Sequence, residues 1–258
     1  IAQLRADGVT VFGPGHGEQA CGEVGDGRML EPEQLFDLLT GLTQAKTLAG
    51  RRVLLTAGPT FEPIDPVRGI TNSSSGKMAY GLARACVQAG AEVVLVSGPV
   101  ALPVPMGAHR VSVRSALEMR EAVLAVVPGS DVFIGVAAVA DYRPAAAAEH
   151  KIKKSGAELA ITLTPNPDIL AEVAALPNPP FCVGFAAESR NLDEYAEGKR
   201  KAKKLPMVVG NLVQDGLGGD DNQVVLFDEA GRHPLPKAPK PEVARSIVAH
   251  LAALLPRN

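Results

Sequence analysis

From Arg51 onward the sequence alternates short apolar runs with segments of helical periodicity, and this alternation constrains the fold more than any other feature. Candidate strands span residues 51–58, 91–98, 131–140, 180–188, 207–213 and 222–228. Candidate helices span residues 76–90, 115–127, 166–176, 192–205 and 242–255. Most of the strands are almost continuously apolar, which is typical of parallel strands covered on both faces. We therefore expect an α/β fold with a doubly wound, mostly parallel, Rossmann-like sheet, a type that binds ligands beyond the carboxyl ends of its strands.

The composition is that of a globular protein and excludes several functional classes. Of the 258 residues, 46% are hydrophobic and 21% are charged, and both fractions are near the average for globular chains. No run approaches the roughly 18 apolar residues of a membrane-spanning helix. The formal net charge of −2 argues against a general nucleic-acid-binding surface. We expect neither a membrane nor a nucleic acid as a partner.

Cysteine and histidine are scattered along the chain. Cys21, Cys86 and Cys182 form no CxxC pair and offer no disulfide framework, which fits a reducing, cytoplasmic setting. No two of the five histidines stand at ligand spacing, so we expect no structural zinc site. The chain begins at Ile1 without a charged and then apolar leader, which predicts a fragment of a longer cytoplasmic polypeptide.

Residues 1–50 differ in character from the rest. The stretch VFGPGHGEQACGEVGDGRMLEP is rich in Gly and in turn signals, and one amphipathic helix is expected at residues 31–45, before a linker at 46–50. This segment is too short to form a core of its own. We therefore place a domain boundary between residues 1–50 and residues 51–258.

The stretch GITNSSSGKM, residues 69–78, places a polar Ser-Gly-Lys turn directly before a helical segment. It does not satisfy the phosphate-loop pattern GxxxxGK[ST]. Ser73, Ser74 and Ser75 suit a helix N-terminus, either as caps alone or together with an anion bound to the unpaired N–H groups. The preceding loop is far longer than the roughly two to six residues usual for such a connection. Long loops at this edge usually carry function, which favours the anion site.

Several motifs, in one order, resemble a known family. They are LLTAGPTFEPIDPVRGITNSSSGKM, FIGVAAVADYRP, HKIKKSG, LTPNPDIL, VGFAAES and YAEGKRKAKKL. From about Arg51 to the C-terminus they resemble the synthetase half of the bacterial bifunctional coenzyme A biosynthesis protein, a phosphopantothenate-cysteine ligase that is not of the ATP-grasp type. The resemblance implies a homodimer that joins 4'-phosphopantothenate to cysteine with CTP and Mg²⁺, through an acyl-cytidylate intermediate. A carboxylate oxygen is a poor leaving group until it is esterified to phosphate.

The resemblance also implies a nucleotide site. Lys151 is expected to be catalytic, as a charge clamp on the triphosphate while the acyl-cytidylate forms. Lys199 and Lys203 share one helix face and match two lysines that the family uses for CTP. Asp141 is expected to bind a nucleotide hydroxyl or to hold Mg²⁺ through water, and Phe185 to lie against the cytosine ring. The other implied nucleotide-binding residues are Gly135, Val136, Ala137, Pro167, Asp168, Ile169 and Leu170.

Simpler interpretations of these residues stay open at this point. Without the family, Lys199 and Lys203 would be solvated surface charge within the run KRKAKK. Asp168 would be a first-turn carboxylate favoured by the helix dipole. Phe185 would be a core side chain, Asp141 a turn or cap residue, and the lysines of HKIKK the guards of an edge strand.

On the substrate side, the resemblance assigns a second catalytic role to Asn72. Its neutral amide can donate to an acyl oxygen and accept from an amine, which suits the conversion of the acyl-cytidylate to product. Arg68 is a candidate for binding a substrate phosphate or for a subunit interface. The remaining implied substrate-binding residues are Gly58, Ser74, Ser75, Gly76 and Lys77.

Two features depart from an intact family member. ACGEVGDGRM resembles the tail of the partner half, phosphopantothenoylcysteine decarboxylase, and makes Cys21 a relic of that flavin-dependent enzyme. Because the FMN-binding body is missing from this sequence, neither FMN binding nor decarboxylation is expected. The family commonly has Asn-Asp where this chain has Asn211-Leu212, which puts any role of the second carboxylate in doubt.

Two rival functions remain. An NAD(P)-linked oxidoreductase would need a GxGxxG turn after the first strand and an acidic residue roughly twenty positions later, and TAGPTFEP does not supply that turn. A non-catalytic nucleotide-binding module would bind CTP without releasing pyrophosphate.

Overall fold

The structure is a computed structural model that describes residues 1–154, 156, 158–216 and 219–256. It divides into two compact units, Ile1–Lys46 and Thr47–Asn258. The first unit contains α1 (Ala2–Ala6), an antiparallel hairpin of β1 (Gly15–Glu18) and β2 (Val24–Arg28), and α2 (Pro32–Thr43). A capping box between Glu31 and Gln34 begins α2, and none of the residues of this helix is buried.

The second unit is built on one eight-stranded sheet. Six of its strands are parallel, in the order β7-β6-β3-β8-β11-β12, and β14 and β15 continue the sheet beyond β12 as antiparallel strands. The bounds are β3 (Arg52–Ala57), β6 (Glu92–Ser97), β7 (Ala108–Ser112), β8 (Val132–Gly135), β11 (Phe181–Glu188), β12 (Met207–Leu212), β14 (Val225–Asp228) and β15 (Gly231–Pro234). This arrangement confirms the expected Rossmann-like fold.

The strand order reverses between β3 and β8. From β3 the chain continues outward through β6 and β7, and it then returns to β8 and continues through β11 and β12 on the other side. The carboxyl ends of β3 and β8 therefore diverge at a topological switch point, where open α/β sheets bind their ligands. A parallel bridge between Pro59 and Ala138 joins the two loops that leave these strands.

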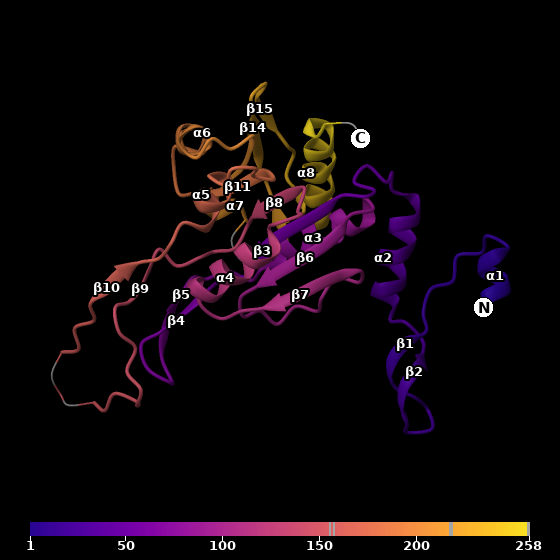
Figure 1. The fold of residues 1–258 in the computed structure, drawn as a ribbon, viewed down its shortest axis with the longest axis horizontal. Coiled ribbons are helices and arrows are strands. Elements are labelled where there is room, and N and C mark those ends of the chain that lie inside the picture. Colours follow the sequence, from indigo (N-terminus) through magenta and orange to yellow (C-terminus); the bar gives the residue numbers. More distant parts are fainter. Residues whose placement is uncertain (155, 157, 217–218, 257–258) are drawn as a thin grey trace. The chain divides into compact units, whose positions relative to one another are not determined.

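Helices cover both faces of the sheet (Figure 1). On one face, α3 (Lys77–Gln88) and α8 (Lys240–Leu254) pack over Leu55; on the other, α4 (Ala116–Val126), α5 (Ile169–Ala174) and α6 (Leu192–Ala202) pack over Leu54. Leu54 and Leu55 are both fully buried because successive strand side chains point to opposite faces. Burying a side chain of this size contributes about 1.5–3 kcal/mol.

Short elements decorate the carboxyl edge. A hairpin of β4 (Phe61–Pro63) and β5 (Gly69–Thr71) lies in the loop after β3, and a pair formed by β9 (Tyr142–Pro144) and β10 (Leu163–Pro165) follows β8. The chain between β9 and β10 extends away from the sheet (Figure 1). The remaining elements are α7 (Val213–Gly216), β13 (Asp221–Asn222) and β16 (Ala238–Pro239). No helix among the described residues is long and apolar enough to cross a membrane.

The structure corrects two of the expected strands. The run at 131–140 is a strand only to Gly135, because the next residues turn away and bond to the side chains of Thr56 in β3 and Thr60 in the loop after it. The run at 222–228 contributes β14, which is antiparallel to β12. The apolar pattern did not predict the edge strand β7, because this strand carries the exposed polar residues His109 and Arg110.

Candidate functional site

Two adjoining cavities lie at the carboxyl edge of the sheet. The larger cavity has a volume of about 510 Å³ and the smaller cavity about 150 Å³. They share a wall of four lining residues, Val136, Ala138, Phe185 and Ala187. Because Val136 and Ala138 follow β8 and the other two residues belong to β11, the shared wall lies beside the switch point.

The smaller cavity is formed around the N-terminus of α3. Gly76 is the N-cap, with a φ of 75°, and Gly58 has a φ of 71°, conformations that favour glycine. A Cβ at either position would come within 3.0 Å of Val100 Cγ1, so the two turns are packed closely together. Gly76 has no side chain with which to cap α3, but Ser74 Oγ accepts from Gly76 N at 3.4 Å and Ser75 Oγ accepts from Lys77 N at 3.5 Å. These long hydrogen bonds agree with the expected serine caps and place both hydroxyl groups at the first turn of the helix.

Two lysines line the smaller cavity. Lys77 Nζ forms an ion pair with Asp220 Oδ1 at 2.6 Å. Lys240 Nζ donates to the carbonyl oxygen of Gly216 at 2.9 Å and also to that of Gly219. Burial and the nearby charge of Lys77 lower the pKa of Lys240. Two ammonium groups and a helix N-terminus suit a small anion.

The larger cavity is bounded by the segment 136–141, which side-chain hydrogen bonds hold in place. Thr56 Oγ1 accepts from the N–H groups of Val136 and Ala137, both at 3.2 Å. Thr60 Oγ1 accepts from Ala140 N at 3.0 Å, and the carbonyl of Ala140 accepts from Asn166 Nδ2 at 2.8 Å. These bonds explain why the apolar run does not continue as a strand.

The opposite side of the larger cavity carries Asp168, Lys199 and Lys203. Asp168 is the N-cap of α5 and accepts from Ala171 N at 3.0 Å, while Lys203 Nζ forms an ion pair with its other oxygen. Burial opposes ionisation of Asp168, but the bonds from Lys203 and Ala171 outweigh it and lower the pKa. Lys199 Nζ donates to the Phe185 carbonyl at 2.5 Å, and burial, followed by repulsion from Lys203, lowers its pKa.

The structure gathers most residues of the expected nucleotide site around the larger cavity. Lys199 and Lys203 are half-buried there, so they are not simply solvated surface charge. Asp141 is exposed at its edge and belongs to no close group of three metal-ligating side chains among the described residues. The residues brought together are Gly135, Val136, Ala137, Asp141, Pro167, Asp168, Ile169, Leu170, Phe185, Lys199 and Lys203.

The expected substrate residues divide into two groups. The smaller cavity is lined by Gly58, Ser74, Ser75, Gly76 and Lys77. Asn72 and Arg68 lie outside both linings. Asn72 is nevertheless hydrogen-bonded to two residues that line the larger cavity. Its Nδ2 donates to the carbonyl oxygens of Ala138 at 3.1 Å and Val139 at 3.2 Å.

Arg68 belongs to a separate cluster around Asp65, which includes the main chain of Ile152, the residue after Lys151. The buried carboxylate of Asp65 accepts from the Arg68 guanidinium at 2.5 Å and from Ile152 N at 3.1 Å, and Arg68 Nη2 donates to Ile152 O at 2.9 Å. Arg68 holds the pKa of Asp65 well below its usual range. Lys151 is exposed next to this cluster and does not line either cavity. Residues 151–154 form no strand, which removes the edge-strand interpretation of the lysines.

Several lining residues escaped the sequence analysis. Thr56 lies within a predicted strand, and Asn166 directly precedes the expected Pro167. A polar side chain near the end of a strand or loop was the only feature that could have indicated a role for either residue in the site. Lys240 stands in the Pro-rich stretch PKAPKP, whose composition indicates a stiff surface connection and gives no sign of a binding site. Asn211 lines the smaller cavity, whereas its neighbour Leu212 ends β12 outside both linings. Cys21 is exposed in the first unit.

Comparisons with known proteins agree with these observations. Residues 48–255 match the family model of the DNA/pantothenate metabolism flavoprotein C-terminal domain. The chain is 48% identical over 261 residues to the coenzyme A biosynthesis bifunctional protein CoaBC of Vibrio vulnificus strain YJ016, which covers 99% of this chain and 65% of that protein. It is 51% identical over 257 residues to CoaBC of Vibrio cholerae serotype O1, which covers 97% of this chain and 64% of that protein. The chain thus spans less than two thirds of each relative.

Solved structures give the same result. A crystal structure of the C-terminal domain of CoaBC shares 41% identity and a TM-score of 0.71, covering 81% of this chain and 98% of that one. The structure described as the Cab2 mutant H337A complex with phosphopantothenate-cysteine shares the fold at 16% identity and a TM-score of 0.67, covering 85% and 91%. The resemblance to the C-terminal half of the bifunctional protein is confirmed, and the chain belongs to the family of the DNA/pantothenate metabolism flavoprotein C-terminal domain.

Proposed function

We propose that this chain is a CTP-dependent phosphopantothenate-cysteine ligase acting in coenzyme A biosynthesis. The observation that carries the proposal is the pair of cavities with one shared wall, because a reaction between two phosphorylated substrates needs two anion-binding sites that meet. The names of the CoaBC relatives support the same pathway. A protein that shares this fold has been solved in complex with phosphopantothenate-cysteine, which supports a product of this kind.

In the first step, the substrate carboxylate attacks the α-phosphate of CTP. A new bond forms between the carboxylate oxygen and the phosphorus, and pyrophosphate leaves. We assign the nucleotide to the larger cavity, where Lys199 and Lys203 neutralise phosphate charge. We assign the phosphate of 4'-phosphopantothenate to the smaller cavity, with Lys77 and the start of α3. The carboxylate and the α-phosphate then meet along the shared wall.

In the second step, the cysteine amine attacks the acyl carbon, CMP leaves with the bonding electrons, and the amine loses a proton. Asn72 is the residue that we assign to this step. Its contacts to Ala138 and Val139 hold it against the main chain beside the shared wall. A neutral amide at that place can interact with both the acyl oxygen and the amine.

Mg²⁺ fits the larger cavity, although the protein offers few ligands. Magnesium commonly uses one or two carboxylates together with substrate phosphates and water. Asp141 is an exposed carboxylate at the edge of the cavity and would hold the ion, directly or through water. When bound, the ion would neutralise triphosphate charge.

Lys151 and the remaining parts of the protein complete the proposal. Lys151 lines neither cavity, and we assign it to the triphosphate because it matches the lysine of the family motif HKIKKSG. A homodimer is a further part of the proposed assembly. We assign residues 1–50 to the tail of the partner decarboxylase half, which they resemble. The protein acts in the cytoplasm.

The decisive experiment follows pyrophosphate release from CTP and Mg²⁺ by the purified chain, with and without 4'-phosphopantothenate. We expect release only with this substrate, and amide formation when cysteine is added. Replacing CTP with ATP in the same assay tests the nucleotide preference. Tight CTP binding without substrate-dependent pyrophosphate release would overturn the ligase and favour a non-catalytic nucleotide-binding module.

A further inference from the structure

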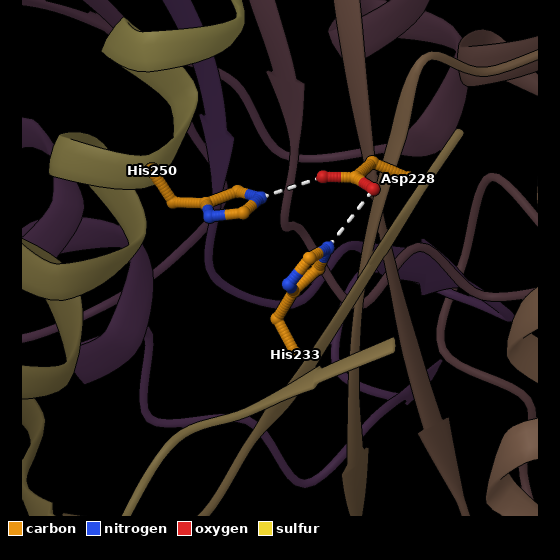
Figure 2. A group of neighbouring side chains, drawn as sticks. All are labelled: Asp228, His233 and His250. Atoms are coloured by element: carbon orange, nitrogen blue, oxygen red, sulfur yellow. Dashed lines mark hydrogen bonds and ion pairs between the residues drawn. The ribbon is translucent and has the colours of Figure 1, made fainter. Parts of the chain in front are cut away.

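Three side chains outside both cavities converge on one point (Figure 2). Asp228 ends β14, His233 lies in β15 and His250 lies near the end of α8. His233 Nε2 is 3.0 Å from Asp228 Oδ1, and His250 Nε2 is 2.7 Å from Asp228 Oδ2. Their potential ligand atoms all lie within 4.8 Å of one another. The two histidines are far apart in sequence, so their spacing gives no sign of this cluster.

The carboxylate at the centre is held in a fixed orientation. Asp228 Oδ1 accepts from the main-chain N–H groups of Ala230 at 2.8 Å and Gly231 at 3.1 Å. The side chain of Asp228 is only 3% exposed, whereas those of His233 and His250 are 36% and 24% exposed. A buried, oriented carboxylate next to two partly open imidazoles combines fixed geometry with access from solvent.

We propose that Asp228, His233 and His250 bind one divalent transition-metal ion of the zinc class. Two imidazole nitrogens and one carboxylate oxygen suit Zn²⁺, Ni²⁺ or Cu²⁺ better than Mg²⁺, which prefers oxygen ligands alone. Zinc bonds of about 2.0–2.2 Å place tetrahedral ligand atoms slightly farther apart than the two hydrogen bonds do now. Binding therefore needs a rearrangement of the cluster, whose potential ligand atoms now lie within 4.8 Å of one another, that brings both Nε2 atoms and one carboxylate oxygen to distances suited to one ion, and water completes the coordination.

The protons can be accounted for. Each histidine donates from Nε2 to the carboxylate, so in a neutral imidazole the Nδ1 atom carries no proton. Metal binding requires a lone pair on Nε2, and the proton moves to Nδ1 of the same ring. The ion thus takes the place of the two N–H groups between the rings and Asp228. It connects α8 to the β14–β15 hairpin.

The test is a titration of the full chain, free of any histidine tag and treated with chelator, with ZnCl₂ in a calorimeter. We expect one ion per chain and a higher melting temperature with zinc, because a ligand that binds only the folded state stabilises it. Co²⁺ as a second probe should give the visible absorption of a site with nitrogen ligands. A chain that binds no zinc, or binds it without a stoichiometric site, overturns the proposal.

Matched variants locate the ion. His250→Gln and His233→Gln should each weaken zinc binding at least about tenfold, because each removes one of three ligands. His16→Gln is the control, since His16 contacts Asp26 at 2.9 Å in an exposed two-residue pair. Two variants are used so that the test does not depend on a single variant that folds incorrectly, and circular dichroism checks that both are folded. Unchanged affinity in both cluster variants, or an equal loss in the control, would contradict the assignment.

Discussion

Asn72 Nδ2 donates to the main-chain oxygen of Ala138 at 3.1 Å, which joins the loop before α3 to the wall shared by the two cavities. An Asp at this position has no N–H group to donate and would place a negative charge against a carbonyl oxygen. We expect Asn72→Asp to release pyrophosphate but to form amide about 10²–10³-fold more slowly, the scale for losing one positioned donor. Rapid-quench analysis should then show the acyl-nucleotide accumulating.

The control for this variant is Asn178→Asp, an exposed residue in the loop before β11. It should retain wild-type rates in both half-reactions. If Asn72→Asp forms amide at the wild-type rate, Asn72 has no part in the second step.

Lys151 should affect chemistry and not folding. Its side chain is exposed and lines neither cavity, so Lys151→Gln should leave the melting temperature unchanged. Loss of the charge that we assign to the triphosphate should slow pyrophosphate release by about 10²-fold or more. Lys154→Gln, three residues away and equally exposed, is the matched control. Equal rates for the two variants would remove Lys151 from the reaction.

Lys199 should make nucleotide binding sensitive to alkaline pH. Burial, followed by repulsion from Lys203, lowers its pKa below the ordinary 10.5, so its positive charge is lost earlier as pH rises. We expect CTP affinity to fall toward alkaline pH, and to fall less steeply in Lys199→Arg, because guanidinium stays protonated. Calorimetric titration between about pH 7 and pH 10 measures this. Parallel pH profiles for this variant, wild type and the exposed control Lys201→Arg would count against the assignment.

Asp65 should hold the segment that carries Lys151. Asn at this position loses the charge that pairs with Arg68, although it can still accept from Ile152 N. We expect Asp65→Asn to accelerate trypsin cleavage after Lys151, with Glu149→Gln as the exposed control. Because Arg68 lowers the pKa of Asp65 from 3.8, this contribution to folding is present above that pH and is lost as pH falls through the lowered value. A cleavage rate equal to that of the control would show that Asp65 does not hold this segment in place.

The cysteines should differ sharply in reactivity. Burial raises the pKa of Cys86 and of Cys182 to about 12, whereas Cys21 is exposed. A thiol reagent at about pH 8 attacks thiolates, so one group per native chain should be modified. Cys21→Ser should abolish the labelling, and denaturant should expose all three cysteines. Rapid labelling of Cys86 or Cys182 in the native chain would show that the core opens readily.

Much of the molecule follows from local sequence. Apolar runs and helical periodicity predicted the central strands and the helices α3, α4, α5, α6 and α8, because period and turn chemistry act over a few residues. The family motifs also named eleven residues that line the larger cavity. Most of those residues lie at or after the carboxyl end of β8 or at the start of α5, and the topology of a doubly wound sheet brings such segments to one edge. Phe185 lies in β11, and Lys199 lies in α6.

Tertiary packing alone decided the rest. The periodicity of residues 76–90 places Tyr80 with Lys77 on the polar side of the helix, yet Tyr80 is buried and its hydroxyl lies 3.1 Å from Ser97 Oγ at the end of β6. The bonds of Arg68 and Asp65 to Ile152, and the meeting of His233 with His250 at Asp228, join segments with no shared local pattern. Sequence periodicity determines which face of an element is apolar; only the packed fold determines which distant side chain lies opposite it.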